Sequence, residues 1–483
     1  MAELRDFAHN PEQCADVPRY GDYPSMKTTT PRLRTAGVLS AALTLASCGG
    51  SSTTPLSLFS TGGTTSSAGG SAADGGASGA RVTSGAGGAG TGGVSSAAGS
   101  TSLGGTSSSA GTTSGGGTSN MAGASAGGGS SFTGSGLHVV GNHLEDNGKT
   151  VRLLGWNRPG GEYSCIGDKP TVFDGPTDMA SLQAMQAWSG FNAIRLPLNE
   201  TCWLGINGVN SAASGSNYVT AIASYVSLFR TNGIYVILDM HWNAPGSFIA
   251  NTQMPMADAD HALDFWKQVA TEFKADPGVV LDLYNEPHMN SVPKGTFVAG
   301  NNAADDWSCW LNGGCTISPQ TWEQQTGGYV ATGMQPMLDA VRGTGATNLV
   351  LAGGENWSGD LSGWEAHAPH DSAANLAASA HVYFKPTDCM GAACYSTVQA
   401  FAMATQVPIV TGELGEFDCA HTLIDPFMAW ADTSGVSYLA WSWSLEPCGS
   451  ADYTAGPSLI TNWNGTPTAY GQGFKDHLST LSP

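Results

Sequence analysis

From about residue 134 onward, the sequence repeats one unit, in which an apolar run ends in polar or aromatic residues and is followed by a helical period. Runs rich in β-branched and aliphatic residues are typical of strands buried on both faces. We expect eight such strands, at 151–157, 193–199, 235–242, 279–286, 348–357, 378–384, 408–416 and 436–443. The repeat predicts an α/β fold, a closed (β/α)8 barrel of the TIM type, although periodicity alone also permits a doubly wound open sheet.

Helical periods lie between these runs. We expect helices at 178–188, 218–231, 259–274, 321–341, 397–405 and 423–433. The apolar run 137–142, followed by a turn at Asp146-Asn147-Gly148, predicts an N-terminal β-hairpin that caps the barrel floor. The stretch 459–477 is interpreted as the last barrel segment and its helix.

The first 133 residues have a different composition. A basic segment that begins at Met26 precedes the apolar run 36–45 and the sequence Leu45-Ala46-Ser47-Cys48, which resembles a bacterial lipoprotein signal with Cys48 as the lipidated residue. An ordinary secretory signal is the alternative. We interpret residues 1–48 as a mis-started leader plus this signal peptide, with the true start at Met26. The protein is then exported, either as an outer-membrane or cell-surface lipoprotein or as a secreted protein.

Residues 49–133 are almost entirely Gly, Ser, Thr and Ala, with Asp74 and Arg81 as the only charges. Such a composition cannot bury enough apolar area to offset its ordering entropy, so it predicts a disordered linker. A flexible chain of this length reaches roughly 50 Å. Residues 134–483 form the predicted folded domain.

Eight of the ten cysteines lie in this domain. An even number in an exported protein favours disulfides. Cys309 with Cys315 and Cys389 with Cys394 are close in sequence, and Cys165 with Cys202 and Cys419 with Cys448 are plausible long-range pairs, but sequence does not fix the connectivity. We expect no metal site, because CxxC does not occur with a matching HxxxH.

The charge is strongly unbalanced. From residue 134 onward there are 12 Lys and Arg against 32 Asp and Glu, so the whole formal charge of −20 belongs to the predicted domain. An acidic surface repels nucleic acid and other polyanions, which favours a neutral ligand. We expect a monomer with no nucleic-acid partner.

Two acids stand at strand ends. The apolar run from residue 279 stops at Asn285-Glu286-Pro287, where the proline cannot continue the ladder, and in parallel α/β proteins active sites collect at this end of the strands. Glu413 follows a similar run three strands later, with Glu416 as a nearby rival. Two carboxyl groups across a barrel mouth can straddle one glycosidic bond, one protonating the leaving oxygen while the other attacks or activates water.

Together these residues resemble glycoside hydrolase family 5, the cellulase family, over about residues 137–480. The strongest element is Leu283-Tyr284-Asn285-Glu286-Pro287. The resemblance implies a bacterial retaining endo-β-1,4-glucanase that needs no cofactor. It implies that Glu286 is the acid/base and Glu413 the nucleophile.

The same resemblance implies roles for other residues along the barrel. Arg195 would buttress the nucleophile and favour its ionised form. His241 and His381 would contact the sugar next to the cleaved bond. Tyr383 would hydrogen-bond the nucleophile, and the amide of Asn285 would donate to the sugar 2-hydroxyl.

Aromatic residues lie at or just past several expected strand ends, and flat rings suit the apolar face of a pyranose. Trp441 matches the family's sugar platform, and Trp357 and Trp242 are further candidates for substrate binding. Trp203 and Trp443 occupy similar positions, and for Trp443 core packing is equally plausible. A β-glucan is the expected partner. Related enzymes cleave mannan, xylan or mixed-linkage glucan, a choice that the stretch 201–217 and the loop expected at 301–318 would influence. A surface polysaccharide-binding protein without turnover is the minor alternative.

Overall fold

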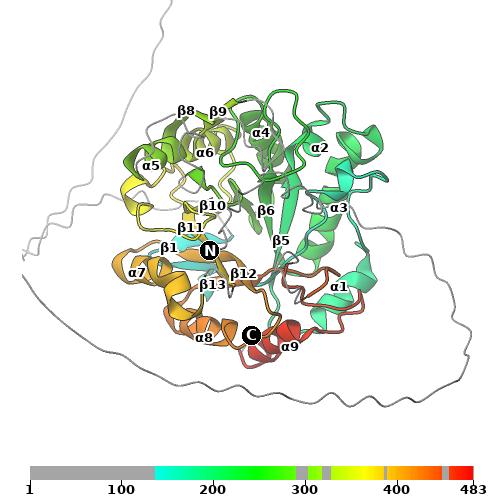
Figure 1. Cartoon of the computed structure of the whole chain (residues 1–483), viewed down its shortest axis with the longest axis vertical. Coiled ribbons are helices and arrows are strands. Elements are labelled where there is room, and N and C mark those ends of the chain that lie inside the picture. The colour runs from blue at the N-terminus through cyan, green and yellow to red at the C-terminus, as the bar shows by residue number, and fades with distance from the viewer. Residues whose placement is uncertain (1–135, 290–302, 318–327, 386–388, 449–455, 482–483) are drawn as a thin grey trace, which may run out of the picture. The chain divides into compact units, whose positions relative to one another are not determined.

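The computed structural model describes residues 136–289, 303–317, 328–385, 389–448 and 456–481, and the predicted signal and linker lie outside these ranges. Its centre is a closed barrel of eight parallel strands, which confirms the predicted barrel and rules out the open sheet (Figure 1). In barrel order the strands are β10 (Val350–Gly353), β11 (Leu376–Phe384), β12 (Ile409–Glu416), β13 (Ser437–Ala440), β4 (Leu154–Asn157), β5 (Ala193–Asn199), β6 (Tyr235–Trp242) and β7 (Val279–Asp282).

Helices surround the strands in Figure 1. They are α1 (Met179–Gln186), α2 (Glu200–Leu204), α3 (Ser216–Thr231), α4 (Ala262–Phe273), α5 (Ala303–Asn312), α6 (Met334–Arg342), α7 (Ser396–Ala404), α8 (Ile424–Ser434) and α9 (Ala469–Ser479). Local chemistry sets several of their ends. The Asp178 side chain accepts a hydrogen bond from the backbone N–H of Ser181 at the start of α1, and Gly435, with a φ of 73°, ends α8.

Two sequence predictions outside the barrel strands are wrong. The helix expected at 321–341 begins only at Met334, because Tyr329–Thr332 forms strand β9; residues 321–327 lie outside the described ranges. The loop expected at 301–318 contains α5 and strand β8 (Gly313–Ile317), which pairs with β9. Tyr329 and Ala331 are buried while Val330 is exposed, and this alternation belongs to a strand rather than a helix.

A small antiparallel sheet of β1 (His138–Val140), β2 (His143–Asp146) and β3 (Lys149–Val151) precedes the barrel. The expected turn joins β2 to β3 through Asn147 and Gly148, with φ values of 52° and 71°. Leu137 and Leu144 of this segment pack in one buried cluster with inward-facing barrel residues such as Val410. The sheet therefore closes the barrel floor, as predicted, with one strand more than a hairpin.

A second apolar layer lies between the strands and the helices. Trp443 is fully buried there, with its ring centroid 5.0 Å from Trp156 and 5.1 Å from Trp188. Trp203 lies on α2, just past the end of β5, and is only 2% exposed. Both tryptophans are therefore core residues rather than substrate-binding candidates.

All four cysteine pairs considered from the sequence are joined as disulfides. Cys165–Cys202 ties the segment after β4 to α2, and Cys419–Cys448 ties the segment after β12 to the one after β13. These two bridges fasten loops at the end of the barrel where the strands terminate.

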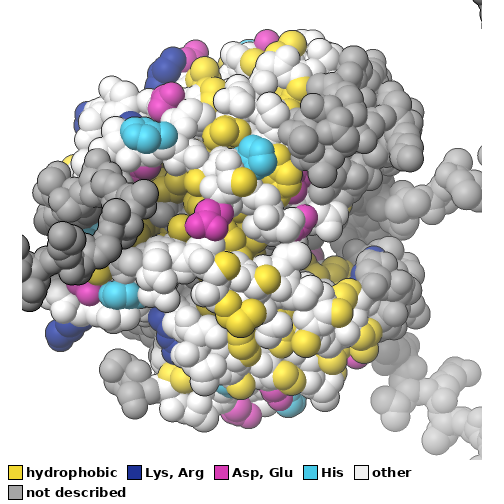
Figure 2. Space-filling model, turned by 90° about the vertical axis from the view of Figure 1, so that its left-hand side faces the viewer, with side chains coloured by type: hydrophobic (Ala, Val, Ile, Leu, Met, Phe, Trp, Pro, Cys, Tyr) yellow, Lys and Arg dark blue, Asp and Glu magenta, His cyan; other side chains and the backbone are white. Residues whose placement is uncertain are grey.

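Figure 2 shows one face of the molecule, on which charged side chains are scattered among uncharged ones and the described residues form no basic patch. Among the residues that the structure describes, none of the helices has the length and apolar character needed to cross a membrane.

Candidate active site

The barrel interior changes from apolar to polar one layer above the floor. Arg195 on β5 is fully buried there, and its guanidinium donates to Asp282 Oδ2 at 3.0 Å and lies 3.0 Å from Asp239 Oδ1. The same group donates to Asn157 Oδ1 at 3.0 Å and to Asn285 Oδ1 at 2.9 Å. Arg195 was expected to buttress the nucleophile, and its burial means that it acts through these neighbours rather than on a sugar.

This layer holds more carboxyl groups than cations. Burial raises the pKa of Asp239 to about 7, against the opposing effect of Arg195, and does the same to Asp282. Burial also works against the charge of Arg195, but Asp239, Asp282 and Glu413 raise its pKa overall. One guanidinium is thus the shared partner of three carboxyl groups, which fixes its orientation.

Glu413 reaches the interior because of an irregularity in β12. Ala380 pairs with Thr411 and His381 pairs with Glu413, so Gly412 is an extra residue, a β-bulge. Val410 packs inside the barrel floor whereas Leu414, four residues later, packs in the outer layer. Regular alternation would put both on one face, so the bulge is what turns Glu413 inward. The carbonyl of Gly412 accepts a hydrogen bond from the Asn157 amide at 2.8 Å.

Two strong donors hold the Glu413 carboxylate. Arg195 donates to Oε1 at 2.7 Å and the Tyr383 hydroxyl donates to Oε2 at 2.6 Å. The rival Glu416 has other partners, since its oxygens accept from the Thr422 hydroxyl and from the backbone N–H groups of Leu423 and Ile424 at the start of α8. Strand β12 ends at Glu416, the end of the expected range, and that acid caps a helix.

Glu286 lies beyond its strand rather than on it. Strand β7 ends at Asp282, four residues earlier than expected, and Glu286 follows with a φ of 51°, an unusual conformation for a residue with a side chain. Its side chain is 13% exposed. Burial raises the pKa of Glu286, and a hydrogen bond from Gln253 opposes that rise.

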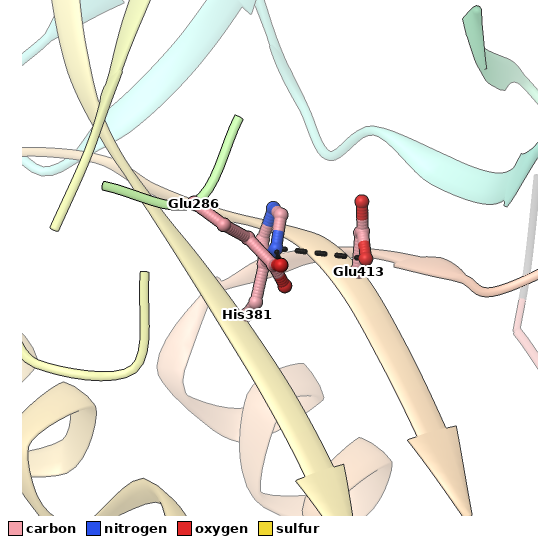
Figure 3. A group of neighbouring side chains, drawn as sticks. All are labelled: Glu286, His381 and Glu413. Carbon is pink, nitrogen blue, oxygen red and sulfur yellow. Dashed lines mark hydrogen bonds and ion pairs between the residues drawn. The ribbon is translucent and has the colours of Figure 1, made fainter. Parts of the chain in front are cut away.

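The two glutamates face each other with His381 between them (Figure 3). Nδ1 of His381 lies 2.8 Å from Glu286 Oε1 and 3.6 Å from Glu413 Oε2. One oxygen of each glutamate and a ring nitrogen of His381 all lie within 4.8 Å of one another. Three such donors could in principle hold a metal ion. The oxygens of the two glutamates already accept hydrogen bonds from Arg195 and Tyr383 and from the Gln253 amide at 2.8 Å.

Two buried histidines complete the polar surface. Burial lowers the pKa of His241 to about 4 and of His381 to about 3, so both rings are neutral near pH 7. His241 Nδ1 lies 2.6 Å from Asp239 Oδ2, which leaves Nε2 to accept from the Asn285 amide at 3.4 Å. Trp441 stacks on the His241 ring with centroids 5.6 Å apart. The structure thus brings the predicted residues His241, Asn285 and Trp441 together at the barrel mouth.

The remaining tryptophans lie in two different settings. Trp357 is partly exposed and stacks on the buried His288 ring at 3.6 Å, within a turn in which Asn356, Trp357 and Ser358 all have positive φ. Trp242, at the end of β6, is 8% exposed and packs against Ala244 and Ala250. An extra residue in β6, His241, brings Trp242 opposite Asn199 of β5.

Sequence reasoning missed Asp239, Asp282, Asn157 and Gln253. A signal existed for the two aspartates, because each interrupts an apolar strand run, Val236-Ile237-Leu238-Asp239 and Val279-Val280-Leu281-Asp282. A charge inside a strand buried on both faces needs a buried partner. Gln253 lies on a long segment between β6 and α4, and nothing in its sequence surroundings marks it.

Glycoside hydrolases use two carboxyl groups that face each other across the substrate site. The fold and site of this barrel therefore define a glycoside hydrolase. The family model for cellulases, glycosyl hydrolase family 5, matches residues 145–446, and the chain belongs to that family.

Curated relatives include endoglucanases. The chain is 28% identical over 176 residues to Endoglucanase C of Evansella cellulosilytica, covering 35% of this chain and 18% of that protein. It is 30% identical over 200 residues to an endoglucanase of Bacillus sp. (strain KSM-635), covering 40% of this chain and 17% of that protein. The matched part is thus less than a fifth of either relative.

Solved structures share the fold. A β-glucanase from Saccharophagus degradans superposes with a TM-score of 0.51 at 21% identity, over 72% of this chain and 94% of that chain, and it has also been solved in complex with cellotetraose. A hyperthermophilic endocellulase from the archaeon Pyrococcus horikoshii gives a TM-score of 0.51 at 19% identity, over 71% of this chain and 99% of that chain.

Proposed function

We propose that the protein is a retaining endo-β-1,4-glucanase that hydrolyses β-glucans through a covalent glycosyl-enzyme. One observation carries this proposal: an oxygen of Glu286 and an oxygen of Glu413 lie within 4.8 Å of each other. Retaining glycosidases hold their carboxyl groups about 5 to 5.5 Å apart, whereas inverting enzymes separate them by about 6.5 to 9.5 Å to admit a water.

In the first step, protonated Glu286 gives its proton to the glycosidic oxygen as the bond from that oxygen to the anomeric carbon breaks. A carboxylate oxygen of Glu413 forms the new bond to the anomeric carbon. The raised pKa of Glu286 suits the acid, and the two donors on Glu413 suit an oriented nucleophile.

In the second step, ionised Glu286 takes a proton from water while the water oxygen attacks the anomeric carbon. The bond to Glu413 breaks, and its carboxylate returns to the hydrogen bonds from Arg195 and Tyr383. Two inversions leave the product in the β configuration. The Asn285 amide, with one hydrogen directed at His241, has a second hydrogen for the sugar 2-hydroxyl.

Three observations support a β-glucan as substrate. Trp441 and the partly exposed Trp357 offer flat rings near the two carboxyl groups, and a neutral pyranose suits such rings. Matched relatives are endoglucanases, and the S. degradans β-glucanase binds cellotetraose. The acidic composition disfavours acidic polysaccharides.

We also propose that the protein is exported as a monomer, either secreted or anchored through a lipid on Cys48 at the cell surface. The signal-like sequence before Cys48 supports this, as do the four disulfides of the barrel. Residue 48 and the predicted linker lie outside the described residues.

The test is reducing-sugar release by the full-length protein from carboxymethyl cellulose, mixed-linkage β-glucan, mannan and xylan, with Glu286→Gln and Glu413→Gln as controls. Release from the glucans that both variants abolish is expected, and proton NMR should detect the β-anomer first. Release from mannan or xylan alone would overturn the substrate, and an initial α-anomer would overturn the retaining mechanism. No release from any polymer would favour a binding protein.

A further inference from the structure

The Gln253 side chain forms a hydrogen bond with the second carboxylate oxygen of Glu286, the proposed acid/base. Its amide Nε2 donates to Glu286 Oε2 at 2.8 Å, while His381 Nδ1 lies 2.8 Å from Oε1. Gln253 belongs to the segment between β6 and α4, so it lies on no strand of the barrel. Glu286 is thus held between two neutral groups that come from different sides of the barrel.

The segment that carries Gln253 is fastened on both flanks. Before it, Ala250 donates its N–H to the Thr201 hydroxyl at 2.9 Å, and its carbonyl accepts from the Asn199 amide at 2.7 Å. After it, the Met254 carbonyl accepts from the Tyr284 hydroxyl at 2.7 Å. Only three residues, 251–253, separate the two anchors, so the position of Gln253 follows from a fixed backbone.

The second anchor also ties Gln253 to the acid itself. Tyr284 precedes Glu286 by two residues, and His288, two residues after it, donates its backbone N–H to the Pro255 carbonyl at 3.1 Å. The Tyr284 hydroxyl and the His288 N–H, on either side of Glu286, thus donate to the carbonyls of Met254 and Pro255, which directly follow Gln253. This pairing holds the two side chains in register even though their segments are distant in sequence.

We propose that Gln253 is a positioning residue for the acid/base, whose amide holds Oε2 of Glu286 and thereby adjusts how readily this carboxyl group gives up its proton. The inference rests on the proposed function and goes beyond it. In a retaining enzyme, Glu286 acts as an acid in one step and as a base in the next. A carboxyl group with too high a pKa would be a poor acid in the first step. The amide offsets part of the effect of burial, because it stabilises the ionised form.

Other groups also face Glu286, and the test must separate them from Gln253. They are Asp239 and His241 of β6, Arg195 of β5, His381 and Tyr383 of β11, and Glu413 of β12. None of them is changed in the variants below. Gln253→Met keeps the length of the side chain and removes its donor, and Gln253→Glu keeps the shape and replaces the donor with an acceptor.

The experiment compares the pH profiles of kcat/KM for the full-length wild type and both variants on the glucan that the wild type cleaves best. The matched control is Gln268→Met, on the exposed side of α4. Gln253→Met loses one hydrogen bond to the ionised carboxyl of Glu286. The alkaline limb of its pH profile should therefore lie about one pH unit higher than in wild type. Gln253→Glu should move it further, and Gln268→Met should leave it in place.

A second substrate separates positioning from folding. The aglycone of 2,4-dinitrophenyl β-cellobioside leaves without protonation, so kcat/KM for this substrate should stay within about twofold of wild type in Gln253→Met. On the polymer, the plateau value of kcat/KM below the alkaline limb should fall roughly tenfold, because the acid has lost the group that holds it in place. Equal losses on both substrates with an unmoved alkaline limb would overturn the proposal, because that is what a loosened loop would produce.

A third measurement does not need turnover. The Glu286 carboxyl can be titrated by carbon-13 NMR in protein labelled at glutamate, with Glu286→Gln used to assign its signal. Its midpoint should be higher in Gln253→Met than in wild type. If wild type cleaves no polymer, the proposed function fails, yet this titration still decides whether Gln253 controls the proton of Glu286. Identical midpoints would overturn the inference.

Discussion

Glu413 accepts hydrogen bonds from Arg195 and Tyr383, whereas Glu286 accepts one from the uncharged amide of Gln253 and lies against His381. Both are glutamates, so the different roles proposed for them come from these neighbours. A cation and a phenol favour a fixed carboxylate, and a buried neutral setting favours a group that can carry a proton.

This division of roles leads to a first prediction, on Glu286. Glu286→Gln should lower kcat/KM on β-glucan by roughly a hundredfold to ten-thousandfold, the usual contribution of a general acid. It should still release dinitrophenol from 2,4-dinitrophenyl β-cellobioside in a single burst, because Glu413 can attack without acid assistance while deglycosylation lacks its base. Stopped-flow absorbance would detect the burst.

Glu416→Gln is the matched control, since that acid caps α8 and does not face Glu286. It should keep steady turnover while lowering thermal stability. Steady turnover in Glu286→Gln would overturn its proposed role as acid/base, and an inactive Glu416→Gln would restore Glu416 as the rival of Glu413 for the nucleophile.

A second prediction concerns His288, the buried ring beneath Trp357. Burial lowers its pKa to about 3, so the folded protein leaves it neutral while the unfolded chain takes up a proton below about pH 6.5. Stability from this group is therefore present above pH 6.5 and is lost as the pH falls toward 3, by about 2 kcal/mol between pH 7 and pH 5. His288→Phe keeps the stack and cannot be protonated, so its stability should fall less over that interval.

Denaturant unfolding at the two pH values would measure this difference. His370→Phe, at an exposed histidine, should retain the full wild-type dependence. If His288→Phe lost as much stability as wild type between pH 7 and pH 5, the neutral buried ring would not be a source of acid sensitivity.

Glu286 and Glu413 were predicted from the apolar runs that they end, and their partners Arg195, His381 and Tyr383 from the family resemblance. The sequence could not predict Gln253, because the contact depends on where a long segment returns in space. Asp239 and Asp282 were detectable in principle, since a charge inside a doubly buried strand needs a partner. Their shared use of Arg195 depends on barrel closure and could not be foreseen.

At the scale of elements, the strands that match best are β5 and β6, whose long apolar runs have the bounds that the sequence predicts. The mistakes lie where a helical period and a strand period compete, as at Tyr329–Thr332. β-Bulges are the other feature that the sequence pattern does not predict. The extra residues at Gly412 and His241 change the facing of a strand, and no periodicity reveals them.

A third prediction concerns the disulfides. Cys165–Cys202 spans a sequence separation of 37 residues and Cys389–Cys394 a separation of 5. If the bridges act by restricting the unfolded chain, removing the first should cost about 4 kcal/mol and removing the second about 2 kcal/mol.

Denaturant unfolding of the Cys165→Ser/Cys202→Ser and Cys389→Ser/Cys394→Ser double variants would measure the free energies of unfolding. Equal losses, or a larger loss for the short loop, would contradict the loop-length argument. Sugar release at low temperature would check that both variants still fold.

At the scale of the whole molecule, the sequence places a barrel behind a predicted linker and a signal-like segment. If Cys48 is lipidated, the linker would let the barrel reach roughly 50 Å from the membrane. An insoluble glucan cannot diffuse to a cell, so this arrangement would bring the enzyme to the polymer and keep the released sugars near their consumer.

The fourth prediction follows from this arrangement. In a bacterial host with a lipoprotein pathway, wild type should take up radiolabelled palmitate and sediment with membranes, whereas Cys48→Ala should incorporate no label. Activity per molecule should be equal in both forms, because residue 48 lies far outside the barrel sequence. Label in Cys48→Ala, or its absence in wild type, would favour an ordinary secretory signal.

The extra glycine in β12 has a consequence for the reading of genomes. Deleting Gly412 would restore regular pairing and leave Glu413 opposite His381 on the inner face, so the proposed nucleophile would be kept while the strand became one residue shorter. A homologue without this glycine could therefore retain its chemistry, and an alignment without a gap would place a different residue at the position of Glu413. Comparison of homologues in this strand therefore has to follow which residue faces the barrel interior, and not only the number of residues.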